Sequence, residues 1–423
     1  MKNKTYIQYL VVSDIFDVQD RVLIHAEEIS SKKIVKRKKG INFKMKTIFY
    51  DDSGYPVERT VINKNNQCVY KQRKLTNLYQ RIIGRLGGEN THYRNNHTYF
   101  NKKEGIYHDF NKIVFGKGKW VTTFETLIPR YDEVVQHQTN QKKTNRLLKG
   151  LRQITYPQNL GVIALSQNAK NIQMKMMDNL DIDPEIQSKV IQKIDVVHPP
   201  QELIVPVDSE QRINETQINL LFVGRDFVRK GGLDTVIALK NLRKNYKNFH
   251  LTIVSKLNSG SYALDDVDLL NFEKVKEFIF NTDWITTYSE LPNDKVLKLM
   301  KSSDIGLLPT RADTYGYSIL EMQAAGTPVI TTNVRAIPEI NTDKTGWIID
   351  VPKNEYGEAL YQTKEELKIL RETIQSELIN VLTDIFHDVE SISERRKASL
   401  IRIWKEHNPK DYAKKIEMIY DRG

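Results

Sequence analysis

The sequence predicts an α/β protein whose second half forms a parallel, doubly wound sheet. From residue 219 onward, short apolar runs alternate with amphipathic segments, a pattern typical of strands joined by crossover helices. The run 305–309 is apolar without interruption, as expected of a strand covered on both faces. A chain of 423 residues is long enough for two or three domains.

The elements of this half follow one another in a regular order. A polar, proline-containing stretch at 198–216 is the best candidate for a linker. At the other end of this half, the chain is expected to be largely helical from residue 363 to its end. Between these two segments we expect strands at 219–224, 250–255, 284–288, 305–309, 328–332 and 347–350, and helices at 233–247, 293–302 and 318–325.

The first half gives weaker signals. We expect a strand at 9–13, a helix at 21–29, and buried strands at 120–124 and 161–166. Between residues 41 and 72, short apolar runs are separated by turn-forming residues, which predicts a hairpin insertion. The turns of that insertion are expected at 51–54 and 63–66.

The positive charge of the chain belongs to the first half. Residues 1–200 carry 34 Lys+Arg and 19 Asp+Glu, a net charge of +15, whereas residues 201–423 carry 30 and 34, a net charge of −4. Such an asymmetry points to an anionic partner of the first half, either a membrane surface or a phosphate-containing polymer. The alternative is a solvated basic surface, and no nucleic-acid recognition motif is evident.

Composition excludes several classes of protein. The single cysteine, Cys68, rules out an internal disulfide framework. No apolar run approaches the roughly 18 residues of a membrane-spanning helix, and the N-terminus does not read as a cleaved signal peptide. We therefore expect a cytoplasmic protein, with peripheral attachment to the cytoplasmic face of the membrane as an option.

One candidate binding loop follows the first strand of the second half. That strand ends at Gly224, Arg225 leaves it, and Lys230 comes just before the next helix. Two cations beside glycine-lined backbone suit a bound phosphate or diphosphate. The alternative is a basic loop that only caps the strand.

A second candidate loop leads from the strand at 305–309 into the next helix. Gly316 permits a tight turn, so the free N–H groups around Gly316, Tyr317 and Ser318 form a helix N-terminus that attracts phosphate. Nearby acids would suit a ligand with hydroxyls on both sides of a diphosphate, such as a nucleotide sugar. These acids are Asp313, just before the turn, and Glu321, about one turn into the helix. The alternative is a plain loop acid and a surface helix residue.

The two acids have seven residues between them, and this resembles the E-x7-E signature of the retaining glycosyltransferases of family 4. The similarity is specific over roughly 219–352 and weak before residue 200. It implies a GT-B fold: two Rossmann-like domains facing a cleft, with the last helix crossing back to the first domain. The expected boundaries are 1–200 for an acceptor-side domain, 201–400 for a nucleotide-sugar domain and 401–423 for the returning helix.

The resemblance also implies roles for matching residues. Arg225 and Lys230 would neutralise the diphosphate of the donor, Glu321 would hold the ribose hydroxyls, and Asp313 would hold hydroxyls of the transferred sugar. The remaining donor-binding positions are then Gly224, Tyr288, Leu291, Gly316, Tyr317 and Ser318.

The same resemblance implies catalysis without a metal or other cofactor, with a UDP-sugar as the favoured donor. Cationic side chains and a helix start would do what a divalent ion does elsewhere. The two Asp-x-Asp stretches, at 181–183 and 266–268, sit in polar, helix-like contexts, and we interpret their acids as solvated.

Some residues depart from the family pattern. The first acid of the signature is Asp313 and not glutamate, so its side chain is one methylene shorter. Asp17 belongs to a segment that replaces the usual glycine pair after the first strand. Glu125 stands where the family often has a histidine, and it either acts in place of that histidine or is a structural carboxylate. His108 is a further candidate near the cleft, with an exposed surface histidine as the alternative.

The resulting prediction is a retaining hexosyltransferase that uses a nucleotide diphosphate sugar. Its acceptor would be anionic or membrane-anchored: a saccharide, a lipid-linked glycan or a cell-wall polymer. Two alternatives stay open, a catalytically inactive GT-B partner subunit and a sugar-nucleotide epimerase or hydrolase on the same fold.

Overall fold

The computed structural model describes most of the chain after residue 44. The described ranges are 45–50, 54–63, 67–73, 95–97, 104–129, 141–209 and 216–423. The strand predicted at 9–13, the helix predicted at 21–29 and the candidate Asp17 lie outside these ranges.

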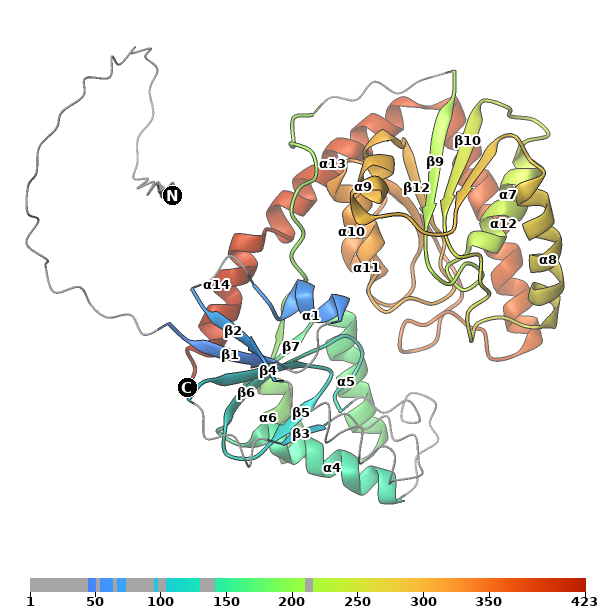
Figure 1. Cartoon of the computed structure of the whole chain (residues 1–423). Coiled ribbons are helices and arrows are strands. Elements are labelled where there is room, and N and C mark those ends of the chain that lie inside the picture. The colour runs from blue at the N-terminus through green and yellow to red at the C-terminus, as the bar shows by residue number, and fades with distance from the viewer. Residues whose placement is uncertain are drawn as a thin grey trace, which may run out of the picture. The chain divides into compact units, whose positions relative to one another are not determined.

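The first of two parallel sheets comes from the N-terminal half (Figure 1). Its strand order is β2-β1-β4-β6-β7-β8, and all neighbours run parallel. A separate parallel pair joins β3 (Asn95–His97) to β5 (Ile113–Phe115). The strands of the main sheet are β1 (Thr47–Tyr50), β2 (Val69–Gln72), β4 (Ile106–Phe110), β6 (Lys119–Phe124), β7 (Asn159–Ala164) and β8 (Ile194–Val196).

The hairpin insertion that we predicted over residues 41–72 is wrong. Its two strands, β1 and β2, pair in parallel, with Thr47 opposite Val69, whereas a hairpin requires antiparallel neighbours. The short helix α1 (Tyr55–Thr60) lies between them in the sequence, with Pro56 in its first turn. The turn-forming residues near Gly54 therefore begin a crossover and do not close a hairpin.

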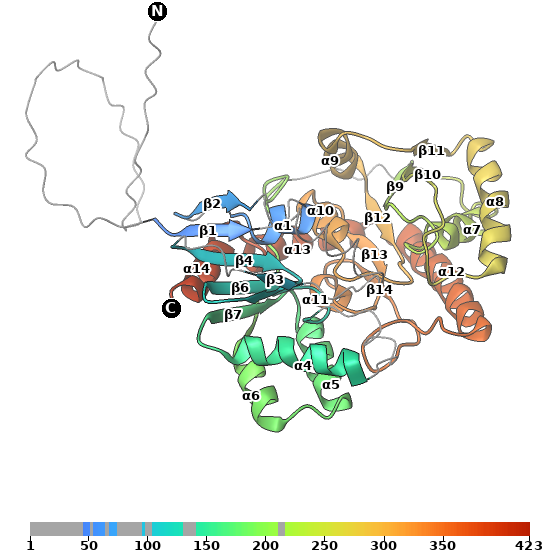
Figure 2. The ribbon, with the colours of Figure 1, turned by 60° about the horizontal axis from the view of Figure 1, so that its bottom comes forward.

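Helices cover both faces of the first sheet. One face packs on α4 (Gln141–Thr155), α5 (Gln167–Asn179) and α6 (Pro184–Gln192). The other face, which includes Ile48 and Val121, buries Ile416 and Tyr420 of the last helix, α14 (Pro409–Tyr420). Figures 1 and 2 both show α14 beside these strands. The prediction that the C-terminal helix returns to the first sheet is confirmed, and the exact domain boundaries stay predictions.

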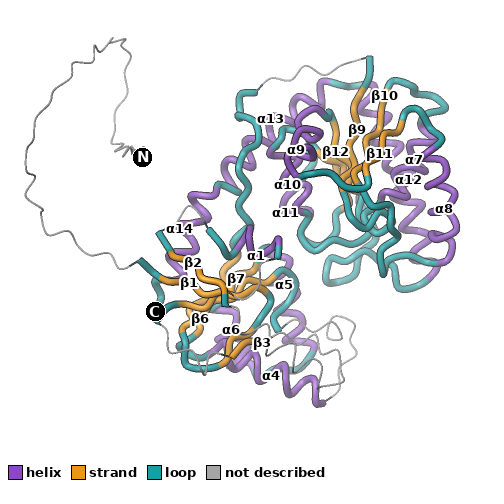
Figure 3. Tube along the Cα trace, in the orientation of Figure 1, coloured by secondary structure: helices purple, strands orange, loops and turns teal. Residues whose placement is uncertain are grey.

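The second sheet is also parallel, with the order β11-β10-β9-β12-β13-β14. Helices flank it on both sides (Figure 3), which confirms the doubly wound prediction. Its strands are β9 (Ile218–Val223), β10 (Phe249–Val254), β11 (Ile285–Tyr288), β12 (Ile305–Leu308), β13 (Val329–Thr332) and β14 (Trp347–Ile349). Its helices are α7 (Gly232–Leu242), α8 (Asp266–Phe280), α9 (Asn293–Ser302), α10 (Tyr317–Ala324), α11 (Ile337–Ile340), α12 (Lys364–His387) and α13 (Glu390–Glu406). Within the described ranges, no helix is both long and apolar enough to span a bilayer.

His108 is a core residue and not a surface histidine. It lies on β4 with no exposed surface. Its Nδ1 is 2.7 Å from the Tyr420 hydroxyl, and its Nε2 is 2.8 Å from the Thr123 hydroxyl. Since both ring nitrogens are engaged with α14 and β6, the alternative of an exposed histidine is wrong, and His108 ties the last helix to the first sheet.

The burial of His108 predicts a loss of stability in acid. Burial lowers the pKa of His108 from 6.5 to about 4, with Asp109 opposing the shift. The unfolded chain binds a proton on His108 more readily than the folded protein does. The stabilisation that comes from keeping His108 neutral is therefore fully present above pH 6.5 and is lost as the pH falls towards 4. The full loss is on the order of 3 kcal/mol. Urea unfolding of wild type and His108→Gln at pH 7 and pH 5 measures it, and equal pH dependence in both proteins would contradict it.

Candidate functional site

The two candidate loops meet at one edge of the second sheet. Their strands, β9 and β12, are neighbours in parallel register, with Leu307 opposite Phe222. Both loops therefore leave the sheet at the carboxyl ends of adjacent strands, the edge where open α/β sheets bind ligands.

Direct contacts join the two loops. Lys230 and Asp313 form an ion pair through Nζ and Oδ2. The Arg311 backbone N–H donates to the Arg229 carbonyl at 3.0 Å, and Arg229 Nη1 donates to the Ala312 carbonyl at 2.8 Å. The predicted phosphate loop and the predicted sugar loop are thus a single structural unit.

Gly231 allows this close approach. Its φ is +81°, and a Cβ placed there would lie 2.0 Å from the carbonyl oxygen of Pro309. No other residue fits that backbone without moving the strand end of β12. The glycine after Lys230 therefore sets the distance between the two loops.

Asp313 is held ionised by its neighbours. Burial alone would raise the pKa of this carboxyl group, but the charges of Lys230 and Arg229 and the Thr314 backbone N–H hold it below the ordinary value. The side chain is only 12% exposed. A buried carboxylate that stays charged can accept hydrogen bonds from ligand hydroxyls.

Arg225 differs from Lys230 in its surroundings. Its side chain is exposed, and none of the hydrogen bonds or ion pairs found in the described part of the chain involves its guanidinium. The loop therefore offers one cation that is already paired and one that is open to an anionic ligand.

The N-terminus of α10 lies at the same edge. Gly316 precedes the helix with φ +92°, and none of the side chains that the structure describes caps it. The amides of Tyr317 and Ser318 begin the helix and point its positive end towards the loops. The Tyr317 hydroxyl is buried without a hydrogen-bond partner among the described residues.

Glu321 of α10 contacts residues of the first half of the chain. Its Oε1 accepts hydrogen bonds from the Tyr55 hydroxyl at 2.5 Å and from Arg59 Nη1 at 2.8 Å. Both donors belong to α1, within the stretch for which the sequence predicts a hairpin insertion. No periodicity or motif in that stretch could have indicated this contact.

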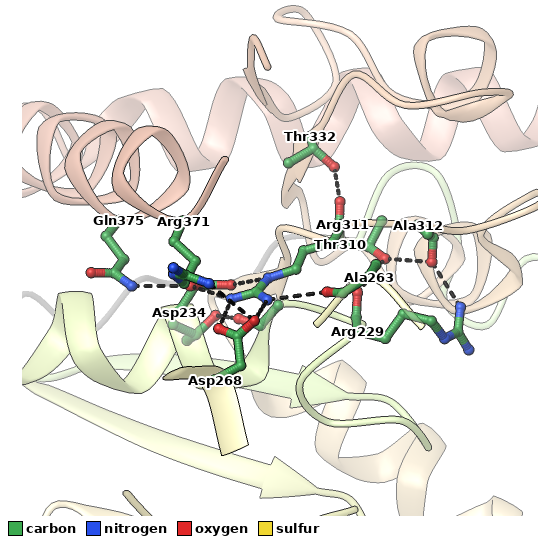
Figure 4. A network of polar contacts seen from close by, with 12 residues as sticks. Arg229, Asp234, Ala263, Asp268, Thr310, Arg311, Ala312, Thr332, Arg371 and Gln375 are labelled. Atoms are coloured by element: carbon green, nitrogen blue, oxygen red, sulfur yellow. Dashed lines mark hydrogen bonds and ion pairs between the residues drawn. The ribbon is translucent and has the colours of Figure 1, made fainter. Parts of the chain in front are cut away.

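A buried polar network supports the loop that carries Asp313 (Figure 4). Arg311 has no exposed surface and uses all five N–H donors. They reach both carboxylate oxygens of Asp234, at 2.8 and 3.0 Å, and of Asp268, at 2.7 and 3.0 Å, and the Ala263 carbonyl at 3.1 Å. Although burial lowers the pKa of Arg311, the two carboxylates outweigh it and raise that pKa.

The network corrects one interpretation of the sequence. Asp268 is fully buried and paired with Arg311, so our prediction that it is a solvated acid is wrong. A usable signal was present, because Asp268 lies at helical spacing from the buried residues Phe272, Val275 and Ile279. The other acids of the Asp-x-Asp stretches, at 181, 183 and 266, are exposed as predicted.

The other candidates take no part in the loop contacts or in the Arg311 network described above. Tyr288, 38% exposed, ends β11, and Leu291 follows it. Glu125 comes directly after β6, where its backbone N–H and its Oε1 contact Asn111 at 3.2 and 3.3 Å. Gly224 follows β9 and packs near Lys230. No cluster of three or more potential metal ligands occurs within the described ranges.

Comparison with known proteins places the second sheet in a family. Residues 207–375 match the family described as glycosyl transferases group 1. Glycogen synthase of Mycobacterium tuberculosis is 28% identical over 120 residues, 28% of this chain and 27% of that protein. A D-inositol 3-phosphate glycosyltransferase of Paenarthrobacter aurescens is 29% identical over 168 residues, 38% of this chain and 40% of that protein. The matches thus span less than half the length of these relatives.

Solved structures are similar over most of the chain. The Anabaena protein Alr3699/HepE, in complex with UDP, has a TM-score of 0.54 at 10% identity, covering 89% of this chain and 100% of that protein. A glycosyltransferase from Rickettsia africae has a TM-score of 0.50 at 16% identity, covering 90% and 99%. At these identities the likeness shows the fold alone. Residues 207–375 therefore form a glycosyl transferase group 1 (family 4) domain, in a chain with the GT-B fold.

Proposed function

We propose that this protein is a retaining glycosyltransferase that moves a hexosyl group from a nucleotide diphosphate sugar to a glycan acceptor. The observation that carries the proposal is the junction of the two loops. It brings Arg225, Lys230, Asp313 and the uncapped start of α10 to one sheet edge. A UDP-sugar is the favoured donor, since the Anabaena structural neighbour was solved with UDP-glucose.

The mechanism follows from where charge develops. The bond between the anomeric carbon and the donor phosphate breaks, and negative charge grows on the departing diphosphate. Arg225, Lys230 and the amides of Tyr317 and Ser318 would stabilise that charge. The acceptor oxygen bonds to the same face of the anomeric carbon, and its proton passes to the leaving phosphate oxygen. Asp313 would hold sugar hydroxyls and Glu321 the ribose hydroxyls.

A screen of donors tests this function. Thermal shifts with UDP, GDP and ADP identify the base, and turnover of the matching sugar nucleotides is then followed with and without acceptor glycans. The proposal requires nucleoside diphosphate binding and acceptor-dependent release of that diphosphate. Binding without turnover would favour an inactive partner subunit, an alternative motivated by the altered first half, which has Glu125 in place of the usual histidine. Acceptor-independent turnover would favour an epimerase or hydrolase.

The acceptor side is proposed to bind an anionic or membrane-anchored glycan at the cytoplasmic face of the membrane. Support comes from the net charge of +15 over residues 1–200. On the described part of that half, Lys149 and Arg152 are exposed on α4 and line a cavity with Phe115 and Tyr156. Cations near an anionic leaflet each contribute roughly 1 kcal/mol.

This proposal predicts a strong salt dependence of acceptor use. Raising ionic strength from about 0.01 to 0.15 M shortens the screening length from roughly 30 to 8 Å. The KM for a polyanionic acceptor should therefore rise severalfold at saturating donor. The double variant Lys149→Ala/Arg152→Ala should show a weaker salt effect than the matched control Lys244→Ala/Lys247→Ala on the second half. A KM for the acceptor that does not change with ionic strength would contradict electrostatic binding of an anionic acceptor.

A further inference from the structure

The carboxylate of Glu321 is held by two residues that the family resemblance does not assign. Tyr55 and Arg59 lie one turn apart on α1, and both donate to Oε1 of Glu321. The Glu321 and Arg59 side chains are 19% and 14% exposed. Hydrogen bonds between charged groups in such partly buried places are short and strong. The orientation of this carboxylate is thus set from the first half of the chain.

Arg59 is itself fixed on several sides. Its Nη2 donates to the Pro200 carbonyl at 3.3 Å and to the Gln201 side chain. Its guanidinium lies 4.8 Å from the ring centroid of Tyr317, the first residue of α10. A guanidinium presents its donors in one rigid plane, so these contacts leave Arg59 little freedom to turn away from Glu321.

The position of α1 is also restrained. The hydroxyl of Tyr412, on α14, donates to the Thr60 carbonyl at 2.5 Å. The Gln201 backbone N–H donates to the His407 carbonyl at 2.8 Å, next to the start of α14. The helix that carries Arg59 and the linker that Arg59 contacts are therefore tied to the same C-terminal segment.

The hydrogen bonds leave one side of the carboxylate available. A carboxylate accepts about four hydrogen bonds, two on each oxygen. Tyr55 and Arg59 use Oε1, and no described residue donates to Oε2 of Glu321. Without these donors the terminal torsion of a glutamate is broad and its oxygens exchange positions readily.

We infer that Arg59 and Tyr55 are positioning residues, which hold Glu321 by one oxygen so that the other oxygen faces the ribose hydroxyls of the donor. This inference rests on the proposed function and extends it. The ribose site is completed by α1 of the first half, so donor recognition depends on residues outside the glycosyl transferase group 1 domain. Through Pro200 and Gln201, the same arginine links the ribose site to the linker between the two sheets.

The test compares a nucleotide with its analogue lacking the ribose hydroxyls. Calorimetric Kd values are measured for UDP and 2′,3′-dideoxyuridine diphosphate, with the wild type, Arg59→Gln and the surface control Lys244→Gln, a residue that is exposed after α7. Loss of Arg59 should weaken UDP binding about tenfold and leave the analogue unchanged, so that the preference for hydroxyls disappears. Tyr55→Phe should do the same more weakly, and Arg59→Lys should restore part of the preference. If Arg59→Gln does not fold, Tyr55→Phe decides the question.

Two results would overturn the inference. UDP binding by Arg59→Gln at or above the wild-type level would mean that Arg59 competes with the ribose for Glu321. Equal weakening of UDP and its analogue would mean a general structural role. Failure of the wild type to bind UDP, GDP or ADP is a separate outcome, because it removes the proposed function and this inference with it.

Discussion

Replacing Arg225 with alanine should lower the rate of sugar transfer by about 100- to 1,000-fold while the protein stays as stable as the wild type. The expected loss equals that of one preorganised donor to a developing anion, roughly 2.7–4 kcal/mol of activation free energy. Stability should change by less than about 0.5 kcal/mol, because the Arg225 side chain is exposed and has no partner within the described ranges. Steady-state kinetics and urea unfolding measure the two quantities.

Lys230→Ala should reduce transfer to a similar degree but should also destabilise the fold. The lysine neutralises Asp313, whose side chain is only 12% exposed. Its removal leaves less positive charge beside that buried carboxylate. The pKa of Asp313 should then rise, because the Lys230 charge is the largest influence that lowers it. The matched control is Lys244→Ala, an exposed lysine that follows α7. Near-normal transfer by both the Arg225 and the Lys230 variants would reject the diphosphate assignment.

Arg311→Met should cost roughly 3–5 kcal/mol of folding free energy, the largest stability effect we expect for a single substitution. Removing one partner of a buried ion pair leaves uncompensated charge, and here Asp234 and Asp268 have no exposed surface. Arg371 and Gln375 still contact these acids, through Nη1 to Asp268 at 3.2 Å and Nε2 to Asp234 at 3.0 Å. They cannot replace the five donors of Arg311.

A second member of the same network provides the comparison. Arg371→Met removes an arginine that is 11% exposed and that, among the described residues, donates to Asp265 and Asp268, so its cost should be clearly smaller. Urea unfolding of both variants measures the difference. Since Arg311 lies two residues before Asp313, the Arg311 variant should also weaken nucleotide-sugar binding. Equal free energies of unfolding for the two variants would contradict the prediction that Arg311 stabilises the fold more than Arg371 does.

The second half could be predicted closely because its signals are local. The helix expected at 293–302 has those bounds in the structure, and the apolar run at 305–309 contains β12. Parallel strands buried on both faces are continuous apolar runs, and the helices between them have a clear period. The two binding loops follow such strands, so their residues could be named from the sequence.

The first half misled the prediction for a physical reason. Residues near Gly54 favour a turn, but whether a turn closes a hairpin or starts a crossover depends on the partner strand, and β1 pairs with β2 and β4 through contacts distant in sequence. The contacts of Arg59 and Arg311 are equally non-local, joining residues 262 and 77 positions apart. Local composition carries no information on such pairs.

A crystal structure of the protein with bound UDP would locate the diphosphate itself. We expect diphosphate oxygens within hydrogen-bond distance of Arg225, Lys230 and the first amides of α10, with the ribose hydroxyls on Glu321. A nucleotide bound elsewhere, with the loops at 224–232 and 313–321 free of ligand, would contradict this expectation.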